Sequence, residues 1–253
     1  MDFYPMIFKR KSFHRFIQPE TVTKEELEDL RSFLREITPL YPDIQTEIRI
    51  VKEEDTTCKR GAEYCVLFYS EPKGEYLRNI GYIGEQVDLY LTSKNIGTLW
   101  FGIGRPKGKA PEGMEYCIMI AIAKMPATSF RKDMFKSKRK SLEETWEGGM
   151  PALADIVRFS PSACNSQPWF TVNDGNALTV YRYKRSGVRG IMPKLMVSYY
   201  NQIDLGIYLF ILETCLAHEN YSWKRELYRD DSEEEDKRIR IAEYTLSDAA
   251  ERK

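Results

Sequence analysis

Apolar residues recur at helical spacing in several stretches of the chain, and this periodicity predicts helices there. The clearest helix start lies at Thr23, which forms a capping-box sequence with Glu26 and is followed by Leu27 and Leu30 on one helical face. The stretches with helical periodicity are residues 2–10, 24–37, 75–95, 151–159 and 193–218. The chain should therefore contain two long helices, one in each half.

Other stretches alternate between apolar and polar residues or form short apolar runs, and both patterns are typical of strands. The run 117–123 is apolar throughout, as in a central strand, whereas 169–173 and 177–183 predict a hairpin. Residues 102–113, rich in Gly, Pro and Lys, predict a loop. The remaining expected strands are residues 46–51, 64–69 and 97–101, and a last one around Ile239 and Ile241.

These elements predict an α+β fold in which mixed or antiparallel sheets are flanked by long helices in packed layers. Each half supplies a long helix and at least two strands, but no similarity returns at a fixed period. Residues 131–149 are dense in Lys and Arg and predict a connecting segment. We therefore expect a first region, 1–130, and a second region, 150–253, within one compact structural unit.

Composition narrows the range of partners. The 253 residues include 38 Lys and Arg and 38 Asp and Glu, so no overall field attracts nucleic acid or anionic lipid. The chain shows no signal-peptide pattern and no apolar run of the ~18 residues that a membrane helix requires. Five scattered cysteines favour reduced thiols over a disulfide framework, and two histidines argue against a His-based metal site. We expect a soluble, cytoplasmic protein that binds small molecules.

The first segment that could form a binding site is the basic run at residues 10–16. Arg10, Lys11, Ser12 and His14 place several cations and a hydroxyl just after a short helix. This arrangement suits a phosphate or another polyanion, because charge-assisted hydrogen bonds from such groups are strong. The alternative interpretation is a solvated basic patch on the surface.

The second segment, residues 160–169, contains Ser160, Pro161, Ser162 and Asn165 and ends in Pro-Trp where a strand is expected. It is rich in small donors and acceptors, so it could contact a polar ligand. The alternative interpretation is a structural helix-to-strand connection, since Ser, Asn and Pro are the residues that such turns use.

Together these two segments resemble the FMN-dependent nitroreductase family, which opens with Arg-Arg-Ser-x-Arg-x-Phe and carries a Ser-Pro-Ser-x-x-Asn-x-Gln-Pro-Trp turn. The matching residues are Arg10, Ser12, Phe16, Ser160, Pro161, Ser162, Asn165, Gln167, Pro168 and Trp169. Weaker similarities lie at 85–86 with 95–100, and at 139–143. Lys11 and His14 stand where the family pattern has arginines.

The order of the motifs resembles a tandem, pseudo-dimeric branch of that family, in which two degenerate repeats are fused into one chain. In the ordinary family the Ser-Pro-Ser turn follows the opening motif closely, whereas here it comes after the late basic segment. The resemblance implies that the FMN phosphate is held by Arg10, Lys11, Ser12 and Arg139. It also implies that residues 160–165 lie against the flavin ring.

The resemblance also implies that three further residues contact the flavin. Gly102 and Ile103 match the family's backbone contacts near the ring, and His14 takes the place of an arginine on that side. Because FMN carries out the redox chemistry itself, no catalytic side chain is assigned. A chain with one copy of each motif should form one FMN site, as a monomer with an internal pseudo-dimer or as a homodimer.

The function implied by the resemblance is an FMN-dependent oxidoreductase that transfers electrons from NADH or NADPH to a small planar acceptor, such as a nitroaromatic or a quinone. One alternative is an FMN-binding or flavin-storage protein with little turnover. Another is a protein that retains the fold but has lost FMN. The flavin content of the purified protein and its oxidation of NAD(P)H distinguish the three.

Overall fold

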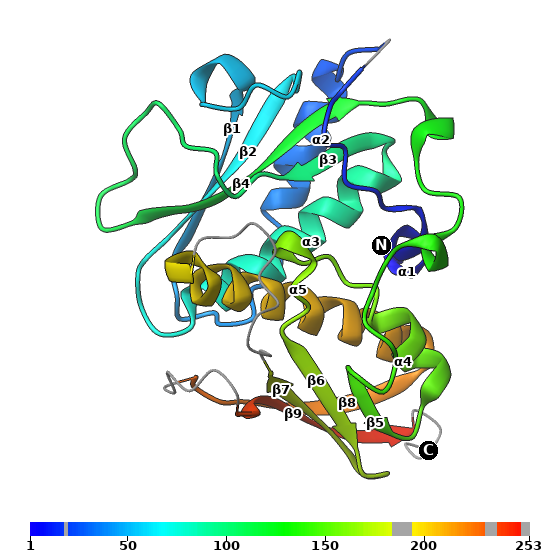
Figure 1. Ribbon diagram of the computed structural model, residues 1–253. Coiled ribbons are helices and arrows are strands. Elements are labelled where there is room, and N and C mark those ends of the chain that lie inside the picture. The colour runs from blue at the N-terminus through cyan, green and yellow to red at the C-terminus, as the bar shows by residue number, and fades with distance from the viewer. Residues whose placement is uncertain (18–19, 184–193, 231–236, 249–253) are drawn as a thin grey trace. The chain divides into compact units, whose positions relative to one another are not determined.

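The computed structural model describes residues 1–17, 20–183, 194–230 and 237–248. It divides the chain into two compact units, Met1–Met134 and Phe135–Lys253, which we call the first and the second unit (Figure 1). Among the described residues, no helix is both long enough and apolar enough to cross a membrane.

The first unit is built on a four-stranded antiparallel sheet with the order β1-β2-β4-β3 (Figure 1). Its strands are β1 (Thr46–Lys52), β2 (Tyr64–Ser70), β3 (Ile96–Trp100) and β4 (Glu115–Lys124). Its helices are α1 (Tyr4–Lys9), α2 (Lys24–Leu34) and α3 (Tyr76–Ser93). The expected central strand is confirmed, because β4 pairs with β2 on one side and with β3 on the other.

The two faces of this sheet are covered by different parts of the first unit. Helix α3 packs against β2, β3 and β4, and it approaches closely at Gly84, where a Cβ would lie 2.4 Å from the Trp100 ring. The other face carries an apolar cluster that includes Leu67 of β2, Met119 of β4 and Phe13 from the N-terminal segment. Both faces are therefore closed by apolar side chains, as the unbroken apolar pattern of β4 requires.

The second unit is built on a five-stranded mixed sheet with the order β5-β6-β7-β9-β8. Strand β5 pairs parallel with β6, and every other pairing is antiparallel. Its strands are β5 (Trp146–Gly148), β6 (Trp169–Asn173), β7 (Ala177–Arg182), β8 (Tyr221–Leu227) and β9 (Ile239–Asp248), and its helices are α4 (Pro151–Val157) and α5 (Val197–His218).

Helix α5 is fixed to the second sheet by aromatic packing and a buried hydrogen bond. The ring of Tyr208 stacks on Trp169 of β6 at 4.8 Å between centroids, and its hydroxyl lies 2.7 Å from the hydroxyl of Thr171. Most residues of α5 are buried, in agreement with its almost continuous apolar sequence.

The α+β fold and the helices and strands expected from periodicity are confirmed, with small differences at their ends. Helix α2 ends at Leu34, so Ile37 lies beyond it. The long second helix was expected from residue 193, which lies outside the described residues; residues 194–196 form a 3₁₀ turn, and α5 begins at Val197. Strands β5 and β8 were not expected from the sequence.

Candidate functional site

The basic segment of the first unit lies alongside β3. Ser12 forms a parallel bridge with Thr98, and the backbone N–H of Phe13 donates to the Thr98 carbonyl at 2.9 Å. The Phe13 ring can approach β3 because Gly97 has no side chain; a Cβ there would lie 2.9 Å from the ring. This pairing fixes the backbone of residues 10–13, which are the residues that the sequence assigned to an anion.

Arg10 is almost fully buried, and its Nε donates to Oδ2 of Asp88 at 2.7 Å. Asp88, one of the most deeply buried residues of α3, also accepts from the Thr98 hydroxyl at 2.6 Å and from Trp100 Nε1 at 2.8 Å. Burial opposes the charge on Arg10, but the nearby carboxyl groups of Asp88 and Glu85 outweigh it and raise the arginine pKa. Arg10 therefore keeps its positive charge inside the protein.

Glu85 lies one helical turn before Asp88 and is fully buried. Neither of its carboxyl oxygens has a hydrogen-bond partner among the residues that the structure describes. Burial, followed by repulsion from Asp88, raises the Glu85 pKa well above its usual value. The raised pKa favours the protonated form of Glu85, and Asp88 is the carboxylate that pairs directly with Arg10.

Arg131 is a second cation beside this pair. Its backbone N–H donates to the Lys9 carbonyl at 3.1 Å, but its guanidinium forms no ion pair within the described part of the chain. Burial and then repulsion from Arg10 lower the Arg131 pKa to about 10, with partial relief from Asp88. Arg131 thus adds a second positive charge beside the Arg10–Asp88 pair without an ion-pair partner among the described residues.

The other predicted residues of the first unit are more accessible. Lys11 donates from Nζ to the Ser129 carbonyl at 2.9 Å, and His14 is exposed. Gly102 and Ile103 lie in the loop after β3, beyond Phe101. The Gly102 carbonyl accepts from Arg105 at 3.1 Å, and the apolar Ile103 side chain is 74% exposed. Apart from Arg10, these predicted residues therefore keep side chains or backbone within reach of solvent.

In the second unit, residues 160–167 form a tight turn held by its own side chains. The Ser160 hydroxyl donates to the Val157 carbonyl at 2.7 Å, and the Ser162 hydroxyl accepts from the Gln167 backbone N–H at 3.1 Å. Asn165 has a positive φ of 57°, a conformation that asparagine tolerates better than most residues. The polar composition of the turn therefore has a structural use in addition to any ligand contact.

Asp204 of α5 holds this turn in place through two hydrogen bonds. Its carboxylate accepts from the Ala163 backbone N–H at 2.9 Å and from the Ser166 hydroxyl at 3.0 Å. Burial raises the Asp204 pKa to about 8, although both hydrogen bonds oppose the shift. An acid between Ile203 and Leu205 in an apolar helix was a visible signal in the sequence, but its partner could not be identified from spacing.

Arg139 contacts the same turn. Its Nη1 donates to Oδ1 of Asn165 at 2.9 Å and its Nη2 to the Phe159 carbonyl at 3.4 Å. The adjacent Lys140 donates from its backbone N–H and from Nζ to Gln167 at 2.9 and 2.8 Å. The late basic segment and the Ser-Pro-Ser turn, distant in the sequence, thus form one hydrogen-bonded group within the second unit.

The predicted cofactor residues therefore form two groups, one in each unit. Sequence reasoning missed Asp204 in the second unit and two residues, Arg131 and Asp88, in the first. Arg131 was missed because nothing distinguishes it from the other cations of a Lys- and Arg-rich segment. Asp88 follows Val87 on the apolar side of a predicted helix, and a carboxylate in that position signals a buried partner.

Comparisons with known proteins give two findings that cover most of the chain. A family model described as "Putative TM nitroreductase" matches residues 2–215. Among solved structures, the crystal structure of "a putative nitroreductase" from Thermotoga maritima covers 97% of this chain and 93% of that chain, with 17% sequence identity and a TM-score of 0.61. This structural likeness establishes the fold.

Other solved structures match about half of the chain. A nitroreductase with bound FMN from Desulfitobacterium hafniense is 15% identical and covers 56% of this chain and 99% of that one, with a TM-score of 0.42. A protein described as "Putative NADH Oxidase" from Clostridium acetobutylicum is 14% identical and covers 55% and 96%, with a TM-score of 0.40. A search of the curated proteins finds no match.

Proposed function

The chain belongs to the nitroreductase family, as its motifs predicted, and we propose from this that it is an FMN-dependent oxidoreductase. We propose further that it takes electrons from NADH or NADPH and passes them to a small planar acceptor, such as a nitroaromatic or a quinone. Bound FMN would supply the electron-transfer chemistry, and the protein would supply binding, orientation and electrostatics.

The observation that supports FMN most strongly is the pair of neighbouring arginines: Arg10 is paired with Asp88, whereas Arg131 has no ion-pair partner among the described residues. An uncompensated cation in a partly buried place costs free energy, and an anion that binds there removes that cost. A phosphate monoester offers the required charge and several acceptor oxygens. The residues present therefore fit the phosphate end of FMN.

The proposed roles of the remaining residues follow the family resemblance. Lys11 and Ser12 would join Arg10 at the phosphate, because both stand next to it on the segment fixed along β3. Gly102 and Ile103 would offer backbone groups to the flavin ring, and His14 would lie on the ring side. These residues all belong to the first unit.

In the second unit, we propose Arg139 as a phosphate ligand and residues 160–165 as the part that faces the ring. The hydrogen bonds from Arg139 to Asn165 and from Ala163 to Asp204 support this role, since they hold the turn in one conformation before any ligand arrives. No side chain is assigned as a general acid or base, because the flavin carries the chemistry.

We also propose that the chain consists of two degenerate nitroreductase-like repeats, 1–130 and 150–253, joined by the basic segment 131–149. One copy of each motif would then give one FMN per chain, in a monomer or in a homodimer. A cytoplasmic location is proposed because none of the five cysteines forms a disulfide, which is usual in a reducing compartment.

The proposal is tested on the purified full-length protein. FMN released by denaturation is counted against protein, and oxidation of NADH and of NADPH is followed with and without a quinone. About one FMN per chain with quinone-dependent turnover supports the proposal. Bound FMN without turnover would indicate a flavin-storage protein, and a protein that takes up no FMN would contradict the proposal.

A further inference from the structure

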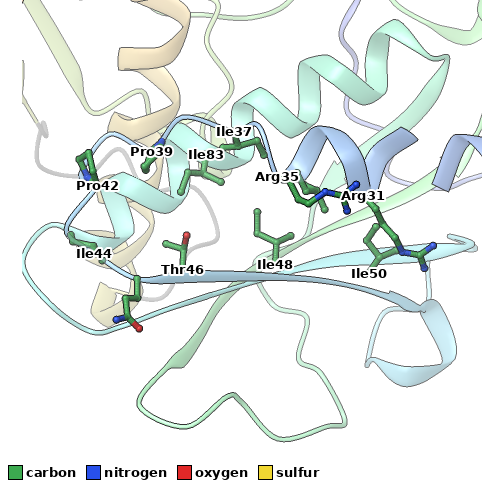
Figure 2. Close-up of a pocket in the computed structure, with 12 residues that line it drawn as sticks. Arg31, Arg35, Ile37, Pro39, Pro42, Ile44, Thr46, Ile48, Ile50 and Ile83 are labelled. Carbon is green, nitrogen blue, oxygen red and sulfur yellow. The ribbon is translucent and has the colours of Figure 1, made fainter. Parts of the chain in front are cut away.

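A pocket with a cavity volume of about 630 Å³ lies in the first unit, between β1, α3 and the end of α2 with the loop that follows it (Figure 2). This volume is within the range of small-molecule sites in proteins, about 300–1,000 Å³. Its base is apolar: Ile48 and Ile50 rise from β1 and Ile83 comes from α3. Figure 2 shows Pro42 and Ile44 at the other end of the pocket from the arginines described below.

The wall of the pocket is held in place by two amide side chains of α3. Buried Asn79 accepts from the backbone N–H groups of Leu40 and Tyr41 at 2.8 and 3.0 Å. Buried Gln86 donates to the Thr38 carbonyl at 2.8 Å and accepts from the Thr38 N–H at 3.3 Å. These bonds fasten the loop between α2 and β1 to α3 at two places, so the pocket is formed without a ligand.

The charge at the pocket is positive at one end. Arg31 and Arg35, one helical turn apart, lie above Ile48 and Ile50 (Figure 2). Arg31 pairs with exposed Glu28, whereas Arg35 donates to the Ser32 hydroxyl at 3.0 Å and has no ion pair among the described residues. No Asp or Glu is among the described residues that line the pocket.

We propose that this pocket binds an organic monoanion with an aliphatic body, such as a medium-chain carboxylate. The apolar base takes the hydrocarbon chain, and Arg35 with Arg31 meets the carboxylate at the open end. Charge complementarity selects an acid over an amine of the same length, and a preformed wall limits the entropy lost on binding. The site is separate in its residues from those proposed for FMN.

The test is a calorimetric titration of the full-length protein with octanoate, decanoate, decanol and decylamine. Each buried methylene adds about 3.7-fold to affinity, so decanoate should bind about fourteenfold more tightly than octanoate. Decylamine should bind most weakly. Failure of decanoate to saturate, or equal binding of decanoate and decylamine, overturns the proposal.

Variants locate the binding. Arg35→Gln should weaken decanoate two- to fivefold, the range of an exposed ion pair, and leave decanol unchanged. Lys24→Gln removes the same charge from an exposed position at the start of α2 and should change neither ligand. Thr46→Trp, on the half-buried edge strand, should fill the pocket and abolish binding of both. Equal loss of decanoate and decanol in Arg35→Gln contradicts the assigned carboxylate contact.

The titration is repeated with protein saturated with FMN and with flavin-free protein. Equal decanoate affinity in both forms supports a separate site. Loss of decanoate binding on FMN addition would place the acid at the flavin site and overturn the proposal. Decanoate binding is measured without any enzymatic turnover, so its absence would not contradict the FMN proposal. A protein that binds no FMN would in turn not contradict the decanoate site.

Discussion

Arg10 and Asp88 form a buried ion pair, with 2.7 Å between Nε and Oδ2, that ties the opening segment to helix α3. The same carboxylate accepts from Thr98 and Trp100 of β3, so a single side chain joins three parts of the first unit. A family motif residue is thereby a structural residue, and the phosphate contact proposed for it can be tested apart from this structural role.

The first prediction concerns that separation. Arg10→Gln leaves Asp88 without its cation in the interior, and this should lower the free energy of unfolding by about 3–5 kcal/mol. Adding Asp88→Asn to the same protein removes the stranded charge and should recover a large part of the loss. Urea unfolding of the two variants and the wild type measures both effects. If Arg10→Gln and the double variant are equally destabilised, the ion pair is not the interaction that holds the opening segment to α3.

The second prediction concerns Arg131. Its guanidinium has no carboxylate partner among the described residues, so Arg131→Gln should leave the flavin-free protein as stable as the wild type or slightly more stable. A charge-assisted hydrogen bond contributes roughly 1.5–3 kcal/mol, so FMN should bind about ten- to a hundredfold more weakly, and riboflavin should be almost unaffected.

Lys132→Gln is the matched control for Arg131, because Lys132 is the next residue and its side chain is exposed. It removes the same charge and should leave both affinities unchanged. Flavin fluorescence titrations give the two dissociation constants, for FMN and for riboflavin, of each protein. If Arg131→Gln lowers the affinities for FMN and for riboflavin by the same factor, Arg131 does not contact the phosphate.

The third prediction concerns Arg139, which hydrogen-bonds Asn165 and the Phe159 carbonyl. If Arg139 also meets the phosphate, Arg139→Ala should weaken FMN about ten- to a hundredfold and riboflavin much less. Lys138→Gln, a change of one charge at the preceding exposed position, is the control. Equal weakening of the two flavins would mean that Arg139 only braces the Ser-Pro-Ser turn.

Some elements of the fold could be predicted from the sequence and others could not. The cap at Thr23, the helix α3 and the central strand β4 could be predicted because capping and periodicity are local properties. Strand β8 could not, since this half-exposed edge strand carries three consecutive charged residues, Lys224, Arg225 and Glu226. Strand β5 is only three residues long and depends on β6.

The same reasoning explains the limits of site prediction. Motif spacing singled out Arg10 and the turn at 160–169 as candidates, because those residues are defined by type and order. It could not identify Arg131, whose importance comes from burial next to Arg10. Nor could it pair Asp204 with Ala163, since the two lie 41 positions apart and meet only when α5 packs under the turn.

The fourth prediction is a pH dependence from Asp204. Burial raises its folded-state pKa to about 8, against about 3.9 for an unperturbed Asp. Between these values the folded state holds a proton that the unfolded state has released, so stability should fall as pH rises from about 4 to about 8. Glu85, whose pKa is also raised, acts in the same direction.

Asp204→Asn keeps an acceptor for the Ala163 N–H and cannot ionise, so it should reduce that pH dependence and stabilise the protein near pH 8. Glu112→Gln, at an exposed loop position, should leave the dependence unchanged. Urea midpoints measured from about pH 5 to about pH 8 give the comparison. A variant whose midpoints run parallel to the wild type would show that Asp204 is not protonated in the fold.

The central claim is that this chain binds FMN and passes electrons through it, and a half-reaction tests it most directly. Purified protein saturated with FMN is mixed with NADH or NADPH in the absence of oxygen, and the flavin absorbance is followed; a quinone is then added. The account predicts that at least one of the two nicotinamides bleaches the bound flavin and that the quinone restores its colour. Bound flavin that stays oxidised with both nicotinamides, or protein that binds no FMN, would contradict it.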